Sequence, residues 1–163
     1  MKNVLKLILV ATSLLLVLVS CKGETVNTEE ADIAGIRERL EELDATENTI
    51  AYSKDGENIL DADYMEYYFG DPALLDGIED YVYYTSATTS VNEIGVFKFS
   101  DEGVKEELLK AFANRIETLA STFALYSKED EDVALGYDSG SVGDAVYFVA
   151  TKDNLPVIEA IRQ

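Results

Sequence analysis

The sequence predicts an α+β domain in which an antiparallel sheet of about four strands is covered on one face by helices. Short runs rich in Tyr, Val and Phe alternate along the chain with longer runs in which apolar residues recur every three or four positions. The longest helical run directly follows a pair of strand-like runs, which is typical of a sheet and the helix that packs on it. The expected order is helix, helix, strand, strand, helix, strand, strand, helix.

The first part of this domain is predicted to be mainly helical. An amphipathic pattern from Ile33 to Leu43 indicates a helix that packs on the sheet, because one and a half heptads are too few to sustain a coiled coil. Thr49–Ser53 is compatible with a short strand, but we leave that segment open. Asp61 is a suitable N-cap for a short helix over Ala62–Phe69, and Gly70 would end it.

The central part contains the two clearest strands and the clearest helix. Strands are predicted at Tyr81–Thr85 and Ile94–Phe99, and Ser100 is the expected N-cap of a long helix. Its apolar residues form one continuous face, whose burial makes this helix the main stabiliser of the domain. They are Val104, Leu108, Phe112, Ile116, Leu119, Ala120 and Phe123.

The last third is predicted to contain a charged loop, a hairpin and a final helix. We expect Lys128–Asp132 to be an exposed loop, and Val133–Tyr137 and Ala145–Ala150 to be paired strands. Residues Asp138–Asp144 would form the flexible tip of this hairpin. The final helix would be capped by Asp153 or Asn154, with Leu155, Ile158 and Ile161 facing inward.

The composition limits the partners of the protein. The 163 residues carry a formal net charge of −19, with 32 acidic and 13 basic side chains. Nucleic acid is therefore excluded as a natural partner, and close contact with anionic lipid headgroups is disfavoured. The content of apolar residues is sufficient for one compact core.

The N-terminus has the features of an export signal. Two lysines precede an apolar run from Leu7 to Val19, which at about 20 Å is shorter than the ~30 Å hydrocarbon core of a membrane. The run ends in Leu18-Val19-Ser20-Cys21, which resembles the lipobox of bacterial lipoproteins. An ordinary secretory leader and a short anchor helix are the alternatives.

The lipobox resemblance implies a location and a division of the chain. Residues 1–20 would be a lipoprotein signal peptide, residues 21–31 a tether and residues 32–163 a single domain. The Cys21 sulfur would be acylated, palmitate being a typical chain, and would hold the protein on the outer face of the cell membrane. The lipid bilayer is then the first expected partner, and an envelope protein or a small ligand is the second.

The resemblance extends into the domain. The run Asp80–Ala87, the following Asn92–Lys98 and the long helix with Arg115-Ile116-Glu117 resemble a family of small lipoproteins from Gram-positive anaerobes. The shared region of that family is a domain of unknown function. The chain departs from the family pattern before the first strand and in the C-terminal hairpin. The resemblance therefore implies fold and location but no chemistry.

Catalysis is not expected. The sequence contains no His, and its one Cys is the expected lipidation site, so catalytic arrangements that need His or a free thiol are excluded. There is no Ser-x-x-Lys dyad and no phosphate-binding glycine loop. Zinc and haem are disfavoured for the same lack of ligands, and no cofactor is expected. Paired carboxylates for glycoside hydrolysis remain a distant alternative.

Two groups of residues are candidates for a binding site. Carboxylates at Asp61, Asp63 and Glu66, and separately Glu129–Asp132, are weak candidates for calcium, although neither has the order of an EF-hand. Tyrosines are candidates for a sugar or peptide groove, because a Tyr side chain supplies a flat apolar surface with a polar tip. They are Tyr64, Tyr67, Tyr68, Tyr81 and Tyr83.

The sequence favours a non-catalytic lipoprotein that acts as a binding or interaction module. The alternative is a solute- or glycan-binding accessory to a transporter or a cell-wall enzyme, which requires a pocket. In the first strand, alternation places Tyr81 and Tyr83 on one face and Val82 and Tyr84 on the other. Exposure of Tyr81 and Tyr83 next to Tyr67 or Tyr68 would support a groove, and burial of all of these tyrosines would exclude it.

Overall fold

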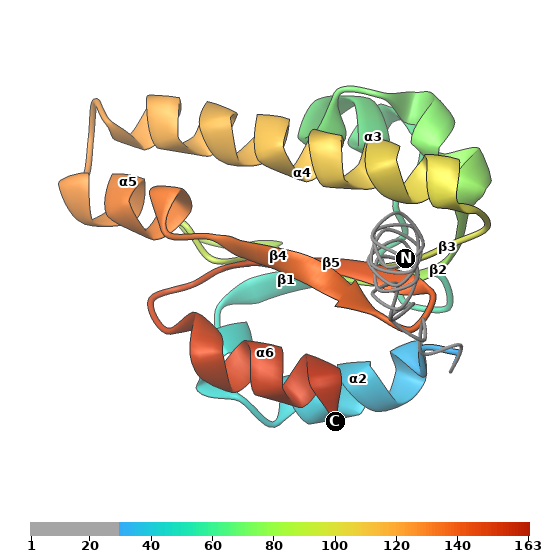
Figure 1. Ribbon diagram of the computed structural model, residues 1–163. Helices are drawn as coiled ribbons and strands as arrows, with labels where there is room; N and C mark the ends of the chain where they lie inside the picture. The colour runs from blue at the N-terminus through green and yellow to red at the C-terminus, as the bar shows by residue number, and fades with distance from the viewer. Residues whose placement is uncertain (1–29) are drawn as a thin grey trace, which may run out of the picture.

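The domain consists of a five-stranded antiparallel sheet between two layers of helices. The computed structural model describes residues 30–163, and the strands lie in the order β1-β2-β3-β5-β4. Helices α3, α4 and α5 cover one face of the sheet, and α2 and α6 cover the other (Figure 1). The strands are β1 (Thr49–Ser53), β2 (Ile78–Ser86), β3 (Glu93–Phe99), β4 (Asp138–Val142) and β5 (Ala145–Ala150). The helices are α2 (Ile33–Glu41), α3 (Ala62–Phe69), α4 (Glu102–Phe123), α5 (Lys128–Leu135) and α6 (Asn154–Arg162), with short 3₁₀ turns η1 (Asp44–Thr46) and η2 (Pro72–Gly77).

The α+β class predicted from the sequence is confirmed, but two details are wrong. The sheet has five strands, because Thr49–Ser53 is a strand that pairs with β2 from Thr49 opposite Ser86 to Ser53 opposite Val82. Helices also cover both faces of the sheet, not one. The reason lies in the three inner strands, whose residues are apolar at successive positions, so that each face of the sheet must be buried.

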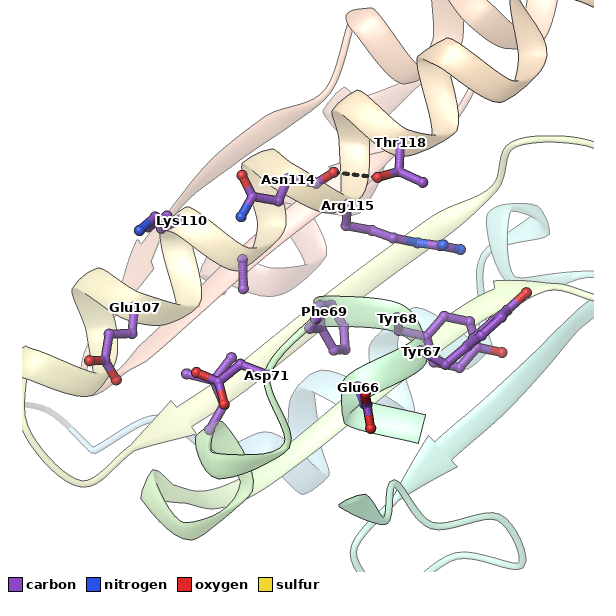
Figure 2. A pocket seen from close by; sticks show the side chains of 13 residues that line it. Glu66, Tyr67, Tyr68, Phe69, Asp71, Glu107, Lys110, Asn114, Arg115 and Thr118 are labelled. Atoms are coloured by element: carbon purple, nitrogen blue, oxygen red, sulfur yellow. Dashed lines mark hydrogen bonds between the residues drawn. The ribbon is translucent and has the colours of Figure 1, made fainter. Parts of the chain in front are cut away.

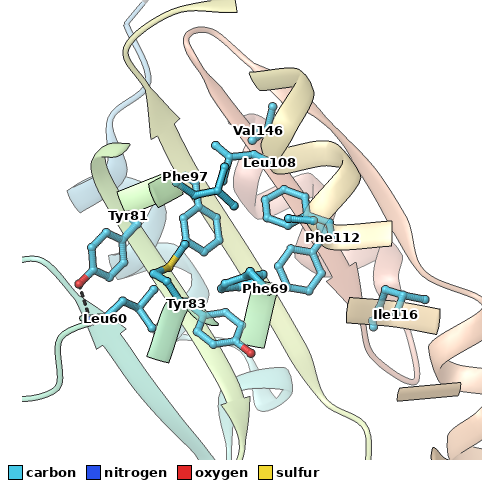
Figure 3. Close-up of a cluster of buried hydrophobic side chains, with 14 of the residues drawn as sticks. Leu60, Phe69, Tyr81, Tyr83, Phe97, Leu108, Phe112, Ile116 and Val146 are labelled. Carbon is cyan, nitrogen blue, oxygen red and sulfur yellow. Dashed lines mark hydrogen bonds between the residues drawn. The ribbon is translucent and has the colours of Figure 1, made fainter. Parts of the chain in front are cut away.

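The inner strands β2, β3 and β5 send alternate side chains into two separate cores. Tyr81 and Tyr83 lie under α3 and α4, together with Phe97 and Phe148, whereas Tyr84 lies under α2 and α6 with Tyr147. Figure 3 shows the first of these cores, in which Tyr83 and Phe97 lie close to Phe69 of α3 and Phe112 of α4. The predicted alternation of β2 is therefore confirmed, and burial accounts for two tyrosines on one face.

The long helix α4 is placed by its apolar face as the sequence predicts. Leu108, Phe112, Ile116, Leu119 and Ala120 are buried against the sheet and α3, and the predicted Val104 and Phe123 pack against the same core at its margins. The expected N-cap is wrong by one residue. The side chain of Asp101, not Ser100, accepts hydrogen bonds from the first-turn backbone, at Gly103 N (2.9 Å) and Val104 N (3.2 Å). Asp101 also offers a full charge to the positive end of the helix dipole.

The segment after α4 differs most from the sequence prediction. Lys128–Leu135 forms the helix α5, so the expected loop at Lys128–Asp132 and the expected strand at Val133–Tyr137 are both wrong. Ser127 caps this helix, and its first turn carries three acidic residues, which favour a helix N-terminus. The hairpin partner of β5 is instead β4, formed by Asp138–Val142, part of the segment expected to be a flexible tip.

Helices α2 and α6 lie side by side on the opposite face of the sheet and run in opposite directions (Figure 1). α2 buries Ile33, Ile36 and Leu40, as predicted. α6 is capped by Asp153 and buries Val157, Ala160 and Ile161. The inward position expected for Leu155 is wrong, since 70% of its surface is exposed, and Ile158 is only partly buried. The buried stripe of α6 runs through Val157, Ala160 and Ile161, so Leu155, two positions before Val157, lies on the outer side of the helix.

Within residues 30–163, none of the helices combines the length and the hydropathy needed to cross a membrane. The expected signal peptide at residues 1–20 and most of the expected tether lie outside the described residues, and so does Cys21.

Candidate functional site

A buried ion pair between β3 and α4 is the starting point of the candidate site. The Glu93 side chain is only 3% exposed, and the guanidinium of Arg115 pairs with both of its carboxylate oxygens. Nε of Arg115 lies 3.1 Å from Oε2, and Nη2 donates to Oε1. This two-point pairing fixes the plane of the guanidinium as well as its position.

Two hydroxyl groups of β2 complete the surroundings of the carboxylate. Tyr83 donates from its hydroxyl to Oε2 of Glu93 at 3.1 Å, and Thr85 donates to Oε1 at 3.3 Å. Each carboxylate oxygen thus accepts one hydrogen bond from Arg115 and one from β2. The antiparallel register of β2 and β3 makes this possible, since Thr85 lies directly opposite Glu93. A carboxylate engaged in this way anchors Arg115.

Arg115 in turn orients a tyrosine of α3. Its guanidinium carbon lies 5.0 Å from the ring centroid of Tyr68, the geometry of a cation–π contact. The Tyr68 ring also contacts the edge of Tyr83, with centroids 5.3 Å apart. Figure 2 shows Arg115 reaching from α4 toward Tyr68. The partly exposed Tyr68 ring is therefore held by Arg115 and Tyr83, both of which are bound to the buried carboxylate of Glu93.

The pKa shifts reflect this buried arrangement. Burial acts to lower the pKa of Arg115, but the hydrogen bonds and negative charge of Glu93 outweigh it, so the pKa rises above its usual value. Burial and then the charge of Glu93 raise the pKa of Tyr83 well above 10. Burial, followed by the neighbouring Tyr52, also raises the pKa of Tyr68. Arg115 is thus charged and both phenols are neutral at any physiological pH.

A pocket of about 420 Å³ lies above this network, between α3 with the following turn and one side of α4 (Figure 2). Tyr67 and Tyr68 form its aromatic end, Phe69, Leu74 and Ala111 contribute apolar surface, and the remaining side chains are polar or charged. The polar and charged lining residues are Glu66, Asp71, Glu107, Lys110, Asn114, Arg115 and Thr118. The pocket therefore offers a flat aromatic surface beside many hydrogen-bonding groups.

The structure divides the five predicted groove tyrosines. Tyr67 is 74% exposed and lines the pocket together with the half-buried Tyr68. Tyr64 is 42% exposed and stacks on the other side of Tyr68, outside the pocket. Tyr81 and Tyr83 are core residues, and the hydroxyl of Tyr81 accepts a hydrogen bond from Leu60 N at 2.8 Å. The expectation that Tyr81 and Tyr83 line a groove is therefore wrong, because both are covered by α3 and α4.

The weak calcium candidates are not arranged as a cage. Asp61 caps α3 by accepting from Tyr64 N at 2.9 Å, and no group of three or more His, Cys, Asp or Glu side chains within residues 30–163 has the spacing to hold a metal ion. Asp63 and Glu66 lie on α3 itself, and Glu66 contributes to the pocket instead. The acids at Glu129–Asp132 lie in α5, where lysines pair with three of them.

Sequence reasoning missed Glu93 and Arg115 as partners. A signal was present, because Glu93 begins a strand whose next four residues, Ile94–Phe97, carry no polar side chain, and Arg115 directly precedes a buried position of the α4 stripe. A charged residue at such positions is buried only if it is paired. The identity of the pair depends on how α4 lies across the sheet, which the sequence does not specify.

Comparison with known proteins identifies one family. Residues 52–151 match the family described as "Domain of unknown function (DUF4358)". No curated protein and no solved structure matches the chain. The matched region contains the whole network of Glu93, Arg115, Tyr83 and Thr85 and every residue that lines the pocket.

Proposed function

Because the chain belongs to the DUF4358 family, whose function is unknown, we propose a role from geometry: a non-catalytic binding module whose ligand site is the tyrosine pocket between α3 and α4. The ligand we propose is a carbohydrate. This is the glycan-binding form of the alternative that the sequence left open, in which the protein is an accessory to a transporter or a cell-wall enzyme.

One observation carries this proposal. Tyr67 is 74% exposed at the rim of the pocket, next to a Tyr68 ring that Arg115 holds in place. A fixed aromatic surface beside polar groups suits the alternating apolar and hydroxyl surfaces of a sugar. The fixed Tyr68 reduces the entropy that binding would otherwise cost.

The charges at the pocket indicate a ligand that is not strongly anionic. Three carboxylates line it, at Glu66, Asp71 and Glu107, against the two cations Lys110 and Arg115. The charge of Arg115 is already balanced by Glu93. The overall charge of −19 adds a further repulsion of anions.

A second cavity supports the choice of site by contrast. A hollow of about 650 Å³ between the β2–β3 connection and the start of α6 is larger and more apolar, but eight of its twelve lining residues lie outside residues 52–151, within residues 42–45 and 152–157. A site that serves the function of the family is more reasonably placed within the residues that define the family.

The proposed location is the outer face of the cell membrane, with acylated Cys21 as the anchor. The lipobox-like Leu18-Val19-Ser20-Cys21 supports this location, and two acyl chains give a stable anchor where one gives only marginal binding. We expect Cys21→Ala to shift the protein from the membrane fraction to the soluble fraction. Mass spectrometry of the wild type should find acyl chains on Cys21, and an unmodified thiol would contradict the proposed anchor.

Binding to short, neutral oligosaccharides tests the pocket. We expect the di-N-acetylglucosamine unit to bind the purified protein in isothermal titration calorimetry, and Tyr67→Ala to weaken binding about tenfold, a loss of roughly 1.4 kcal/mol. Leu155→Ala is the matched control, because Leu155 is 70% exposed on the opposite face of the sheet. Equal affinities for the wild type and Tyr67→Ala would exclude the pocket as the site. Turnover of the sugar would contradict the non-catalytic role.

A further inference from the structure

The pocket does not end at α4 but continues along it. Asn114 and Thr118 line the tyrosine pocket and also line a second, shallower hollow that follows the outward side of α4 toward its C-terminus. The far end of this hollow is formed by Leu125 and Tyr126, each 80% exposed. The two depressions together form one surface, which we call the α4 groove.

The helix geometry explains why the α4 groove is continuous. One face of α4 carries polar side chains spaced three or four positions apart from Thr118. They are Asn114, Thr118, Ser121 and Thr122. From Asn114 to Phe123, the last residue of α4 before Tyr126, the helix rises by about 14 Å at 1.5 Å per residue. This length exceeds that of a single sugar unit.

Exposed aromatic side chains lie at two places along the groove, with mainly polar side chains between them. Tyr67 lies on the α3 side near Arg115, as Figure 2 shows, Tyr126 lies at the far end, and Asn114, Thr118 and Thr122 form the middle stretch on α4. Glu117 is the one charged residue of the second hollow, although the protein has a net charge of −19. A neutral ligand meets little repulsion there.

The hydrogen-bonding groups of the middle stretch are oriented for a ligand with hydroxyl and amide groups. Thr118 donates its hydroxyl hydrogen to Asn114 O at 2.9 Å, and Thr122 donates to Thr118 O at 2.8 Å, as Figure 2 shows for the first bond. Their hydroxyl oxygens therefore keep lone pairs that can accept from a ligand. Within residues 30–163 the side-chain amide of Asn114 makes no hydrogen bond, so it offers both donors and an acceptor.

We propose that the ligand is a linear, neutral oligosaccharide of several units that lies along the α4 groove from Tyr67 to Tyr126. This inference rests on the proposed carbohydrate binding at the tyrosine pocket and extends it to the length of the ligand. Each aromatic end stacks on a sugar ring, and the polar stretch between them binds the hydroxyl and amide groups of the intervening units.

Affinity as a function of chain length tests the inference. The probes are N-acetylglucosamine oligomers of two, four and six units, titrated into the purified full-length protein in a calorimeter. We expect the affinity to rise with length, because only the longer oligomers reach the far half of the groove. A rise of about 3- to 10-fold corresponds to one added aromatic contact.

Two variants at the far end separate length recognition from binding as such. Tyr126→Ala and the near-isosteric Thr122→Val change exposed side chains that line only the second hollow, so the fold is not at risk. Both should lower the affinity for the hexamer by about 3- to 10-fold and leave the affinity for the dimer unchanged. Tyr67→Ala should lower the affinity for every oligomer, and Leu155→Ala should change none of these affinities.

The outcomes distinguish the two proposals. If the dimer and the hexamer bind equally and Tyr126→Ala has no effect, the extended groove is wrong while the pocket stands. If no oligomer binds at any length, the carbohydrate function itself is wrong, and the extended groove with it. Length-dependent affinity that is lost only in the far-end variants establishes the groove.

Discussion

Substitution of Arg115 by Met is predicted to destabilise the protein more than substitution of an exposed ion-pair residue. Met has nearly the same length as Arg but no charge, so Arg115→Met leaves the carboxylate of Glu93, 3% exposed, without its cation. Removal of one partner of a buried ion pair costs about 3–5 kcal/mol. The hydrogen bonds from Tyr83 and Thr85 remain, which favours the lower end of this range, about 3 kcal/mol.

The opposite substitution is expected to cost less. Glu93→Gln keeps an oxygen that accepts from Tyr83, and the guanidinium that it leaves unpaired is 12% exposed at the pocket, where water reaches it. We expect Glu93→Gln to lower the free energy of unfolding by about 2 kcal/mol. The double variant should lose about 2 kcal/mol less than the two single variants lose together, since it contains no uncompensated charge.

Urea unfolding followed by far-ultraviolet circular dichroism measures these free energies, because the chain has no Trp for fluorescence. The control is Lys128→Met, because Lys128 pairs with Glu131 at 3.0 Å and Asp132 at 2.8 Å while its side chain is 72% exposed. Exposed pairs of this type are screened by water and contribute little. If Arg115→Met and Lys128→Met have the same stability, the buried pair does not organise the site and the reasoning is refuted.

Two further substitutions test the core beneath the pocket. Burial and Glu93 raise the pKa of Tyr83 well above 10, so the folded state keeps this proton at a pH where the unfolded chain loses it. The free energy of unfolding therefore falls as pH rises above about 10, by up to about 1.4 kcal/mol per pH unit for this group. Tyr83→Phe should make this decline shallower by that amount in urea titrations at successive pH values. An unchanged slope in Tyr83→Phe would show that other groups cause the decline. Gly95→Ala should cost about 1–3 kcal/mol in the same assay, because a Cβ there would lie 2.4 Å from Cε1 of Phe148 in the packed core; a variant as stable as the wild type would mean that the rings move apart freely.

The elements with strong apolar periodicity were predictable from the sequence. α4 and the strands β2, β3 and β5 bury apolar side chains at most of the expected positions, so burial and local pattern agree. The four successive apolar residues Tyr81–Tyr84 also contained the information that both faces of the sheet are covered. The sequence interpretation did not use it.

The C-terminal elements were not predictable from apolar pattern, because their sequence conflicts with their structure. β4 is an edge strand of small and polar residues, Asp138–Val142, whose formation depends on pairing with β5 rather than on burial. α5 is highly charged, and its helical state follows from the Ser127 cap and the contact of the buried Ala134 with the core. Tertiary contacts overrode local propensity in β4, whereas in α5 the local cap was the signal that the sequence interpretation missed.

The candidate site was half visible in the sequence. Tyr67 and Tyr68 were identified by residue type, and their place on one short helix brings them to the same pocket. Arg115 and Glu93 are 22 positions apart on a helix and a strand. Their pairing is set by the angle at which α4 crosses the sheet, a property of packing that no local pattern encodes.

The most direct test of the central claim is the location of bound carbohydrate on the protein. A titration of the ¹⁵N-labelled protein with the N-acetylglucosamine hexamer, followed by amide chemical shifts, gives this location. We predict the largest shifts at Tyr67 and along the outward face of α4, including Asn114, Thr118 and Thr122. An absence of shifts at saturating sugar, or shifts confined to the hollow around Val91 and Pro156, would contradict carbohydrate binding at the tyrosine pocket.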